Sequence, residues 1–133
     1  MLRITKMTDY AILVIGELAK GRTIASATTL AASLHLNVPT VSKVLKILSA
    51  AGFVRAIRGA EGGYCLNNGA SDITLADIVT AMDGKLAMTE CCEQDGLCTI
   101  DSFCVFKENW KKINKAMHAL LSQWTIKDML TPL

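Results

Sequence analysis

The stretch that decides the fold is residues 37–66, NVPTVSKVLKILSAAGFVRAIRGAEGGYCL. Asn37 is a favourable N-cap and Pro39 suits the first turn of a helix, so a helix is predicted to begin here and to end near Gly52. Its apolar residues recur every three or four positions and would form one buried face. They are Val41, Val44, Leu45 and Leu48.

A β-hairpin is predicted directly after this helix. The segments FVRAI (53–57) and YCL (64–66) have the composition of short strands, and RGAEGG (58–63) joins them with three glycines that permit the backbone angles of a tight tip. We expect Tyr64 to pack beneath the hairpin. Cys65 lies between two strand residues and is interpreted as a small core residue.

Two helices are predicted upstream. The first starts at Thr8, has Asp9 in its first turn, and carries apolar residues at helical spacing. The second is ATTLAASL (27–34), with Leu30, Ala31 and Leu34 on its apolar face. A short helix, a short turn and a second helix form a helix-turn-helix, and a hairpin that follows it makes a winged helix.

The C-terminal half is predicted to be helical around a cysteine-rich loop. A helix over 73–82 would be capped by Thr74, and a long helix is predicted over 105–124. An apolar stripe on the long helix needs a partner, and a twin helix is the simplest one. The stripe consists of Phe106, Trp110, Ile113, Met117, Leu120, Leu121 and Trp124.

The expected fold is therefore mainly α: a winged helix-turn-helix with a small β-hairpin wing and a long C-terminal dimerisation helix. A chain of 133 residues is long enough for one core, so a single domain over 1–133 is expected. Within it, residues 1–70 would bind DNA, residues 71–104 would form a connecting helix and a cysteine-rich cluster loop, and residues 105–133 would form the dimerisation helix and tail.

Composition and charge narrow the function. The chain has no run of eighteen apolar residues and no signal-peptide pattern, so a cytoplasmic protein without membrane contact is expected. Residues 1–66 carry eight Lys and Arg against three Asp and Glu, which favours a polyanion partner for the first half. The sequence has no glycine-rich phosphate loop and no catalytic thiol–histidine pattern, so neither an enzyme nor a small-molecule substrate is expected.

Double-stranded DNA is the favoured polyanion. In a DNA-binding winged helix the second helix of the helix-turn-helix enters the major groove, and the wing reaches phosphates or the minor groove. The alternative is a winged helix that binds another protein and carries ordinary surface lysines. The predicted DNA contacts are Thr40, Ser42, Lys43 and Lys46 on the helix, and Arg55, Arg58 and Gly59 on the wing.

Residues 90–104, ECCEQDGLCTIDSFC, are called the cysteine segment below; they contain four cysteines, four acidic residues and no Lys or Arg. Cys92, Cys98 and Cys104 are separated by five residues each time, and Cys91 adjoins the first. Zinc sites usually place ligands two to four residues apart, so this spacing favours a larger thiolate-held object such as an iron-sulfur cluster. A thiol/disulfide switch that uses Cys91, a zinc site and simple packing are the alternatives.

Three stretches carry a family resemblance: TKMTDYAILVIGELA (5–19), the RG-x-x-GGY wing, and the evenly spaced cysteines before a long helix. Together they resemble the IscR and NsrR type of dimeric winged-helix regulators, and are most similar to regulators of the SUF iron-sulfur assembly system. The resemblance implies a homodimer on a partly palindromic promoter site. It also implies a 2Fe-2S or 4Fe-4S cluster held by Cys92, Cys98 and Cys104. Occupancy of this cluster would set DNA affinity, and the cluster-bound form would repress, activate or release the promoter.

The resemblance leaves the fourth ligand open. IscR-like members have a histidine three residues after the last cysteine, where this chain has Lys107, and an ammonium is no ligand. NsrR-like members use an aspartate of the other subunit's first helix, which corresponds to Asp9; an acidic residue there also complements the helix dipole. Cys91 and Glu90 are further candidates. We expect the cysteine segment to fold around a cluster that lies between the long helix and the DNA-binding half.

Overall fold

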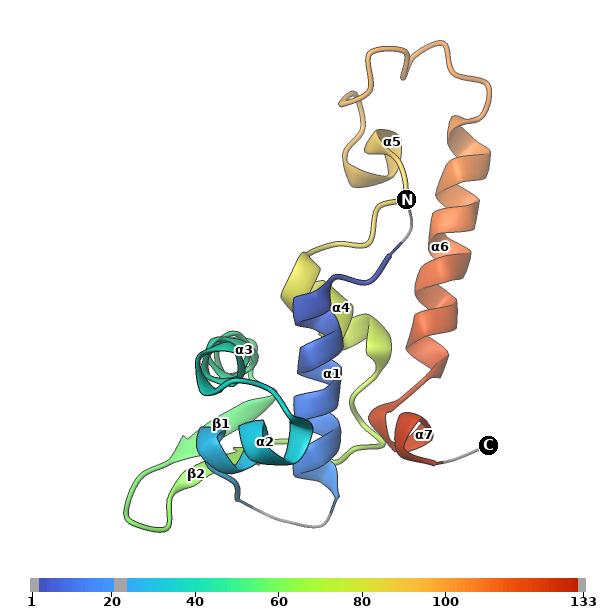
Figure 1. Ribbon diagram of the computed structural model, residues 1–133. Coiled ribbons are helices and arrows are strands. Elements are labelled where there is room, and N and C mark those ends of the chain that lie inside the picture. The colour runs from blue at the N-terminus through green and yellow to red at the C-terminus, as the bar shows by residue number, and fades with distance from the viewer. Residues whose placement is uncertain (1–2, 21–23, 132–133) are drawn as a thin grey trace.

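The computed structural model describes residues 3–20 and 24–131 and consists of helices around a small two-stranded sheet (Figure 1). The expected mainly α winged-helix architecture is confirmed. The helices are α1 (Lys6–Ala19), α2 (Ala27–Leu34), α3 (Val38–Ala50), α4 (Leu75–Asp83), α5 (Glu90–Glu93), α6 (Lys107–Gln123) and α7 (Ile126–Leu130), and the strands are β1 (Val54–Ile57) and β2 (Gly63–Leu66).

Helix α1 is the centre of the core and packs against α2, α3, α4 and α7. Its buried apolar side chains meet the apolar face predicted for α3, all four residues of which are fully buried. Ile73, Ile78 and Ile126 join the same cluster from the C-terminal half. The largest fully buried side chains therefore come from both halves of the chain, and they hold α4 and α7 against the winged helix.

Helix α1 begins two residues before Thr8, where its start was expected. Thr5 is the N-cap, and its hydroxyl oxygen accepts the Thr8 N–H at 3.3 Å. Thr8 is fully buried, and its hydroxyl donates to Asp83 Oδ2 at 2.7 Å. The Thr5 hydroxyl donates to the other oxygen of the same carboxylate at 2.8 Å. The start of α1 is therefore tied to the end of α4.

The wing is an antiparallel hairpin in which Val54 pairs with Leu66 and Ile57 with Gly63. Ala25, just before α2, extends this sheet by two backbone hydrogen bonds with Tyr64, at 2.8 and 3.0 Å. A side chain at Gly63 would meet the Ala25 backbone at 2.6 Å, so the close approach of these segments requires glycine there. As expected, Tyr64 packs against the core and Cys65 is buried.

The C-terminal half differs from expectation at three points. The long helix begins at Lys107, so Val105 and Phe106 precede it. Helix α5 occupies part of the cysteine segment, which was expected to be irregular throughout. Helix α7 was not predicted; Thr125 and Asp128 form its capping box, and Ile126 is fully buried. Thr74 is the N-cap of α4 as predicted, and with Asp77 it forms a capping box.

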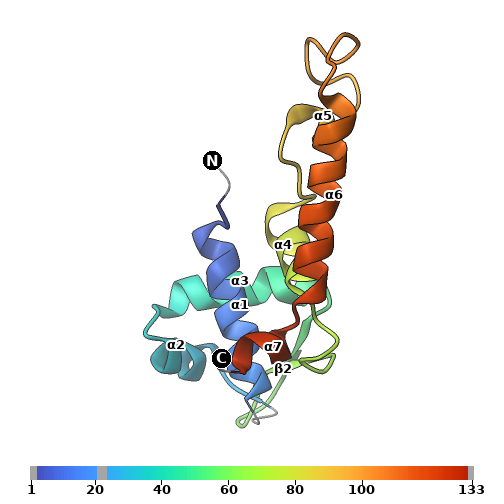
Figure 2. The ribbon, with the colours of Figure 1, turned by 90° about the vertical axis from the view of Figure 1, so that its right-hand side faces the viewer.

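The cysteine segment lies at one end of the molecule and the wing at the other, as both views agree (Figures 1 and 2). Helix α6 runs alongside α4 and carries the segment at its N-terminal end, beyond α4. The expectation that a cluster lies between the long helix and the DNA-binding half stays a prediction; within this chain, the segment lies beyond α4 (Figures 1 and 2). Within 3–20 and 24–131, no helix is long and apolar enough to cross a lipid bilayer.

Candidate nucleic-acid interface and cysteine segment

The turn of the helix-turn-helix fixes the start of α3. His35 adopts a left-handed conformation with φ 58°, which ends α2, and the Leu36 N–H donates to the Ala31 carbonyl at 3.0 Å. The Asn37 side chain then accepts the Thr40 N–H at 2.8 Å, as its predicted capping role requires. The N-terminal end of α3 is therefore held by its own sequence before any partner binds.

Three of the predicted contact residues share the free face of α3. Ser42, Lys43 and Lys46 are exposed and lie within about one turn of each other, while Thr40 is half-buried. In the described parts of the chain, neither lysine forms an ion pair. Their charge is therefore available to an external anion such as a phosphate.

The two wing arginines lie in different places. Arg58 directly follows β1 and is exposed beside Gly59, whose φ is 121°. Arg55 lies on the wing as expected, but inside β1 opposite Cys65 and three residues before Arg58. Its guanidinium donates to Asn67 Oδ1 at 3.0 Å, and the Asn67 amide donates to the Gly52 carbonyl at 2.7 Å.

Asn67 is a positioning residue that was not predicted from the sequence. It holds the Arg55 side chain at the base of the wing, near the end of α3. An asparagine at the end of a predicted strand was the available signal, because its side chain can bond both a neighbouring strand and a turn.

The four thiols of the cysteine segment are all free. Cys92 is buried, with 7% of its surface exposed, whereas Cys91, Cys98 and Cys104 are half-buried. Cys91 and Cys92 lie on α5, and the Thr89 hydroxyl lies 3.0 Å from the Cys91 sulfur and 3.2 Å from the Cys92 sulfur. This hydroxyl bridges the two adjacent thiols.

The thiols of the cysteine segment are suitable ligands for a thiolate-bound metal or cluster, but the structure does not place them close enough together to form a site. Among the described residues, no three His, Cys, Asp or Glu side chains are grouped so that they could hold a metal ion. Asp9 is exposed on α1 and is not part of any such group. Ligation by Cys92, Cys98 and Cys104, with Asp9 or Cys91 as a fourth ligand, stays a prediction that requires these thiols to approach one another.

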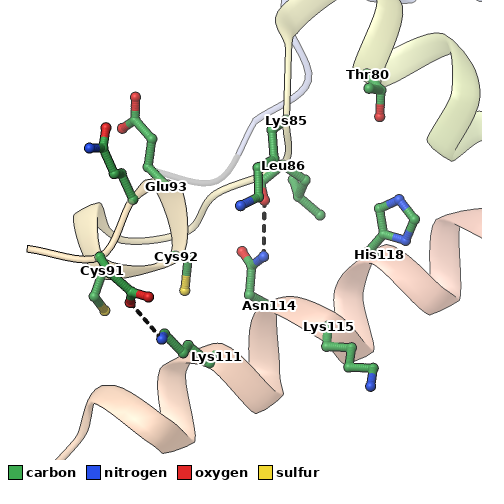
Figure 3. A pocket seen from close by; sticks show the side chains of 12 residues that line it. Thr80, Lys85, Leu86, Cys91, Cys92, Glu93, Lys111, Asn114, Lys115 and His118 are labelled. Carbon is green, nitrogen blue, oxygen red and sulfur yellow. Dashed lines mark hydrogen bonds and ion pairs between the residues drawn. The ribbon is translucent and has the colours of Figure 1, made fainter. Parts of the chain in front are cut away.

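A cavity of about 460 Å³ lies between α5 and α6 and is lined by Cys91, Cys92 and His118 among others (Figure 3). Asn114 of α6 also lines this cavity. Its amide donates to the Leu86 carbonyl at 2.9 Å, and its oxygen accepts the Met88 N–H at 2.8 Å. These bonds hold the chain after α4 against α6. His118, which the sequence placed on the dimer helix, lines this cavity.

Four side chains form an ion-pair cluster where the cysteine segment meets α6: Asp95, Asp101, Lys107 and Lys111. Lys107 Nζ lies 2.6 Å from Asp101 Oδ2 and 3.4 Å from Asp95 Oδ1, and Lys111 Nζ lies 2.7 Å from Asp95 Oδ1. Hydrogen bonding to Lys111, together with the charges of both lysines, lowers the pKa of Asp95 below its ordinary 3.8. The hydrogen bond to Asp101 raises the pKa of Lys107 above 10.5. In the sequence, Lys107 was notable only as a residue that replaces a possible ligand.

Exposed apolar side chains form a stripe on α6 and continue onto the residues before it. All 17 residues of α6, each of which the structure describes, are exposed or half-buried. Phe103 is 85% exposed and Val105 is 84% exposed. Exposed apolar surface of this extent is typical of a protein interface. The larger exposed residues of the predicted stripe are Phe106, Trp110, Ile113, Leu120 and Trp124.

The sequence matches a known family. The model of the family described as Rrf2, iron-dependent transcriptional regulator, matches residues 4–132. Protein rrf2 of Nitratidesulfovibrio vulgaris is 32% identical over 95 residues, which are 71% of this chain and 63%, less than two thirds, of that protein. The transcriptional regulator NsrR of Bacillus subtilis is 26% identical over 97% of this chain and 90% of NsrR.

Solved structures give the same result. The structure of CymR, the global cysteine regulator of Bacillus subtilis, superposes with a TM-score of 0.77 at 28% identity, over 98% of this chain and 97% of CymR. The structure of IscR from T. potens superposes with a TM-score of 0.74 at 28% identity, over 97% of this chain and 86% of IscR. The similarity extends over the winged helix, the cysteine segment and α6.

Proposed function

This chain belongs to the Rrf2 family of transcriptional regulators, and we propose that it is a dimeric member that binds promoter DNA with an affinity set by its cysteine segment. The family match over residues 4–132 includes all the elements that carry this proposal. It also agrees with the expectation that the chain is a regulator and not an enzyme. We further propose that it acts in the cytoplasm, where a bacterial-type regulator meets its promoter.

The observation that carries the DNA-binding step is the free basic face of α3. Lys43 and Lys46 are exposed on a helix whose start is fixed by Asn37, and Arg58 is exposed on the wing. A helix of this kind fits the major groove, and cations on it and on the wing meet phosphates on either side. Ser42 and Thr40 would then be placed to reach base edges or phosphates.

The apolar surface of α6 supports a homodimer. A second copy of the same helix would cover Trp110, Ile113 and Leu120, which otherwise face water. A twofold dimer presents two α3 helices to one face of DNA, so its site would be partly palindromic. The spacing of the half-sites would then report the distance between the two recognition helices.

Cys92, Cys98 and Cys104 are the residues that we propose to hold an iron-sulfur cluster. They are free thiols at even spacing in one segment, and thiolates are the ligands that such clusters use. When bound, such a group would supply sensitivity to iron supply, oxygen or nitric oxide. The proposal that the target genes encode iron-sulfur assembly proteins rests on the resemblance to SUF regulators alone.

A second candidate is a thiol switch, and the pair on α5 favours it. Cys91 and Cys92 are adjacent, contact the same hydroxyl and line one cavity. In this candidate, oxidation of the thiols changes DNA affinity without any metal. Zinc bound by the same thiols would be a third state of this segment.

Two experiments test these proposals. Selection of duplexes from random DNA by the purified protein is expected to enrich two inverted half-sites, and a failure to enrich any sequence would refute promoter recognition. Iron and acid-labile sulfide are then measured in anaerobically reconstituted wild-type protein and in Cys98→Ala. Equal iron and sulfide in the two proteins would refute the ligand assignment, and their absence from both would favour the thiol switch.

A further inference from the structure

The positive charges nearest the cysteine segment come from the first turns of α6. The segment itself has four acidic residues and no Lys or Arg. Lys107 is the first residue of α6 and Lys111 follows one turn later, and both ammonium groups lie within ion-pair distance of segment carboxylates. These two lysines therefore offset part of the negative charge of the segment.

The two carboxylates lie at the midpoints between the predicted ligands. Asp95 is the central residue of the five that separate Cys92 from Cys98, and Asp101 is the central residue of the five that separate Cys98 from Cys104. Lys107 Nζ contacts both carboxylates, at 3.4 and 2.6 Å. One ammonium group thus holds both of the turns that separate the three thiols.

Asp101 also organises the segment from within. Its Oδ2 atom, besides pairing with Lys107, accepts the Gly96 N–H at 3.2 Å, and its own N–H donates to the Cys98 carbonyl at 3.1 Å. Its Oδ1 atom is buried and has no hydrogen-bond partner among the described residues. The Lys107–Asp101 pair therefore lies at the centre of the turns that carry Cys98, and the carboxylate has no other cation within ion-pair distance in the described residues.

Helix stability does not explain why a lysine occupies this position. The positive end of the helix dipole disfavours cations in the first turn and favours carboxylates. Phe106, the N-cap of α6, makes no side-chain capping bond. Glu108 in the first turn complements the helix dipole, and Asp95 and Asp101 are the carboxylates that pair directly with Lys107 at this end of α6.

We propose that Lys107 is the positioning residue of the cysteine segment: by pairing with Asp101 and Asp95 at once, it keeps the turns between Cys92, Cys98 and Cys104 folded on α6 in the metal-free chain. The segment is then ordered before its thiols act. Only the purpose of this order, which is to prepare the thiols for their role as ligands, rests on the proposed function. The order itself is a property of the metal-free protein and is measured without iron or DNA.

The test is hydrogen–deuterium exchange of full-length, reduced, chelator-treated protein, read in peptides that cover residues 90–106. Lys107→Met keeps much of the side-chain length and removes the charge. We expect it to speed exchange in these peptides by roughly three- to tenfold, the range for losing one mostly buried and one more exposed ion pair. Lys107→Arg is expected to keep the wild-type rate. Lys112→Met is the matched control, because Lys112 is exposed on the same helix and forms no ion pair within the described residues.

Unchanged exchange in Lys107→Met overturns the proposal, as does the same acceleration in Lys112→Met. If Lys107→Met speeds exchange across the whole chain, Asp101→Asn decides, because it removes the main pair from the other side. Wild-type exchange of residues 90–106 in Asp101→Asn then also overturns the proposal. The rate at which iodoacetamide alkylates Cys98 and Cys104 is a second measure of this order. It should rise in the same variants in which exchange becomes faster.

The outcome is separable from that of the proposed function. Faster exchange in Lys107→Met supports the positioning role even if wild-type protein takes up no iron and sulfide. The converse result is that wild-type protein takes up a full cluster while the segment of Lys107→Met exchanges as slowly as that of wild type. This result supports the proposed ligands and overturns the role of Lys107.

Discussion

The Thr8 hydroxyl donates a hydrogen bond to Asp83 Oδ2 across 2.7 Å and so joins the first helix to the end of α4, 75 residues later in the chain. Asp83 is the last residue of α4, and the chain that leads to the cysteine segment begins directly after it. This contact and the bond from the Thr5 hydroxyl to the same carboxylate therefore link the DNA-binding half to the chain that enters the segment.

Asp83→Ala is expected to destabilise the fold by about 1–3 kcal/mol, because the fully buried Thr8 hydroxyl loses its acceptor. Urea unfolding followed by circular dichroism measures the change. Thr8→Val is expected to rescue part of the loss in the double variant, since no buried hydroxyl then lacks a partner. Full additivity of the two single variants would contradict the direct link.

Asn37→Ala is expected to cost about 0.5–2 kcal/mol, because the Thr40 N–H loses its capping acceptor. Asn37→Asp keeps an acceptor at this position and serves as the control for unfolding. The Ala variant should also bind DNA more weakly, since the start of α3 loses its fixed geometry. Stability equal to wild type would show that the cap does not hold α3.

Gly63→Ala is expected to displace the wing and to cost about 1–3 kcal/mol, because the added Cβ would lie 2.6 Å from the Ala25 backbone. At Gly69 the nearest atom to such a Cβ is a side-chain oxygen of Asp72 at 3.4 Å, so Gly69→Ala is the matched control. Thermal unfolding of the two variants compares them. Equal melting temperatures would contradict the close approach of β2 and Ala25.

Asp95 is expected to titrate below the ordinary aspartate value of 3.8, because Lys111 and Lys107 favour its charged form. A pKa that folding lowers contributes stability above the unfolded-state pKa, near 4, and this stability is lost as pH falls through the folded value. Carboxyl ¹³C NMR of the folded protein measures the pKa. In Lys111→Met the value should rise, and an unchanged value would contradict the pair.

Lys43→Ala and Lys46→Ala are each expected to weaken binding to the selected duplex and to reduce the dependence of log affinity on log salt by about one. Fluorescence anisotropy at several salt concentrations measures both effects. Lys112→Ala on α6 is the control and should leave affinity and slope unchanged. If neither α3 variant differs from this control, the basic face of α3 is not the DNA contact.

Much of the winged helix was predictable from local patterns. The buried face of α3, its Asn37 cap and the Thr74 cap of α4 follow from residue spacing and cap chemistry, and each is confirmed. Helices α5 and α7 were missed because four and five residues are too few to reveal a helical period.

The contacts that organise the cysteine segment were not predictable in the same way. Lys107 and Asp101 are six residues apart in chain that is helical only from Lys107 onward, so no periodicity brings them together. Thr8 and Asp83 belong to elements whose packing only the folded core determines. The position of Lys107 was marked by the family pattern, but as a missing ligand and not as the partner of two carboxylates.

The central claim is that the cysteine segment sets DNA affinity. Its most direct test is the affinity of wild-type protein and Cys98→Ala for the selected duplex, each measured anaerobically in reconstituted and in chelator-treated form at one salt concentration. The account predicts that the two wild-type forms differ at least tenfold in Kd, whereas the two forms of Cys98→Ala bind alike. Equal affinities of the two wild-type forms, with iron and sulfide present in the first, would contradict it.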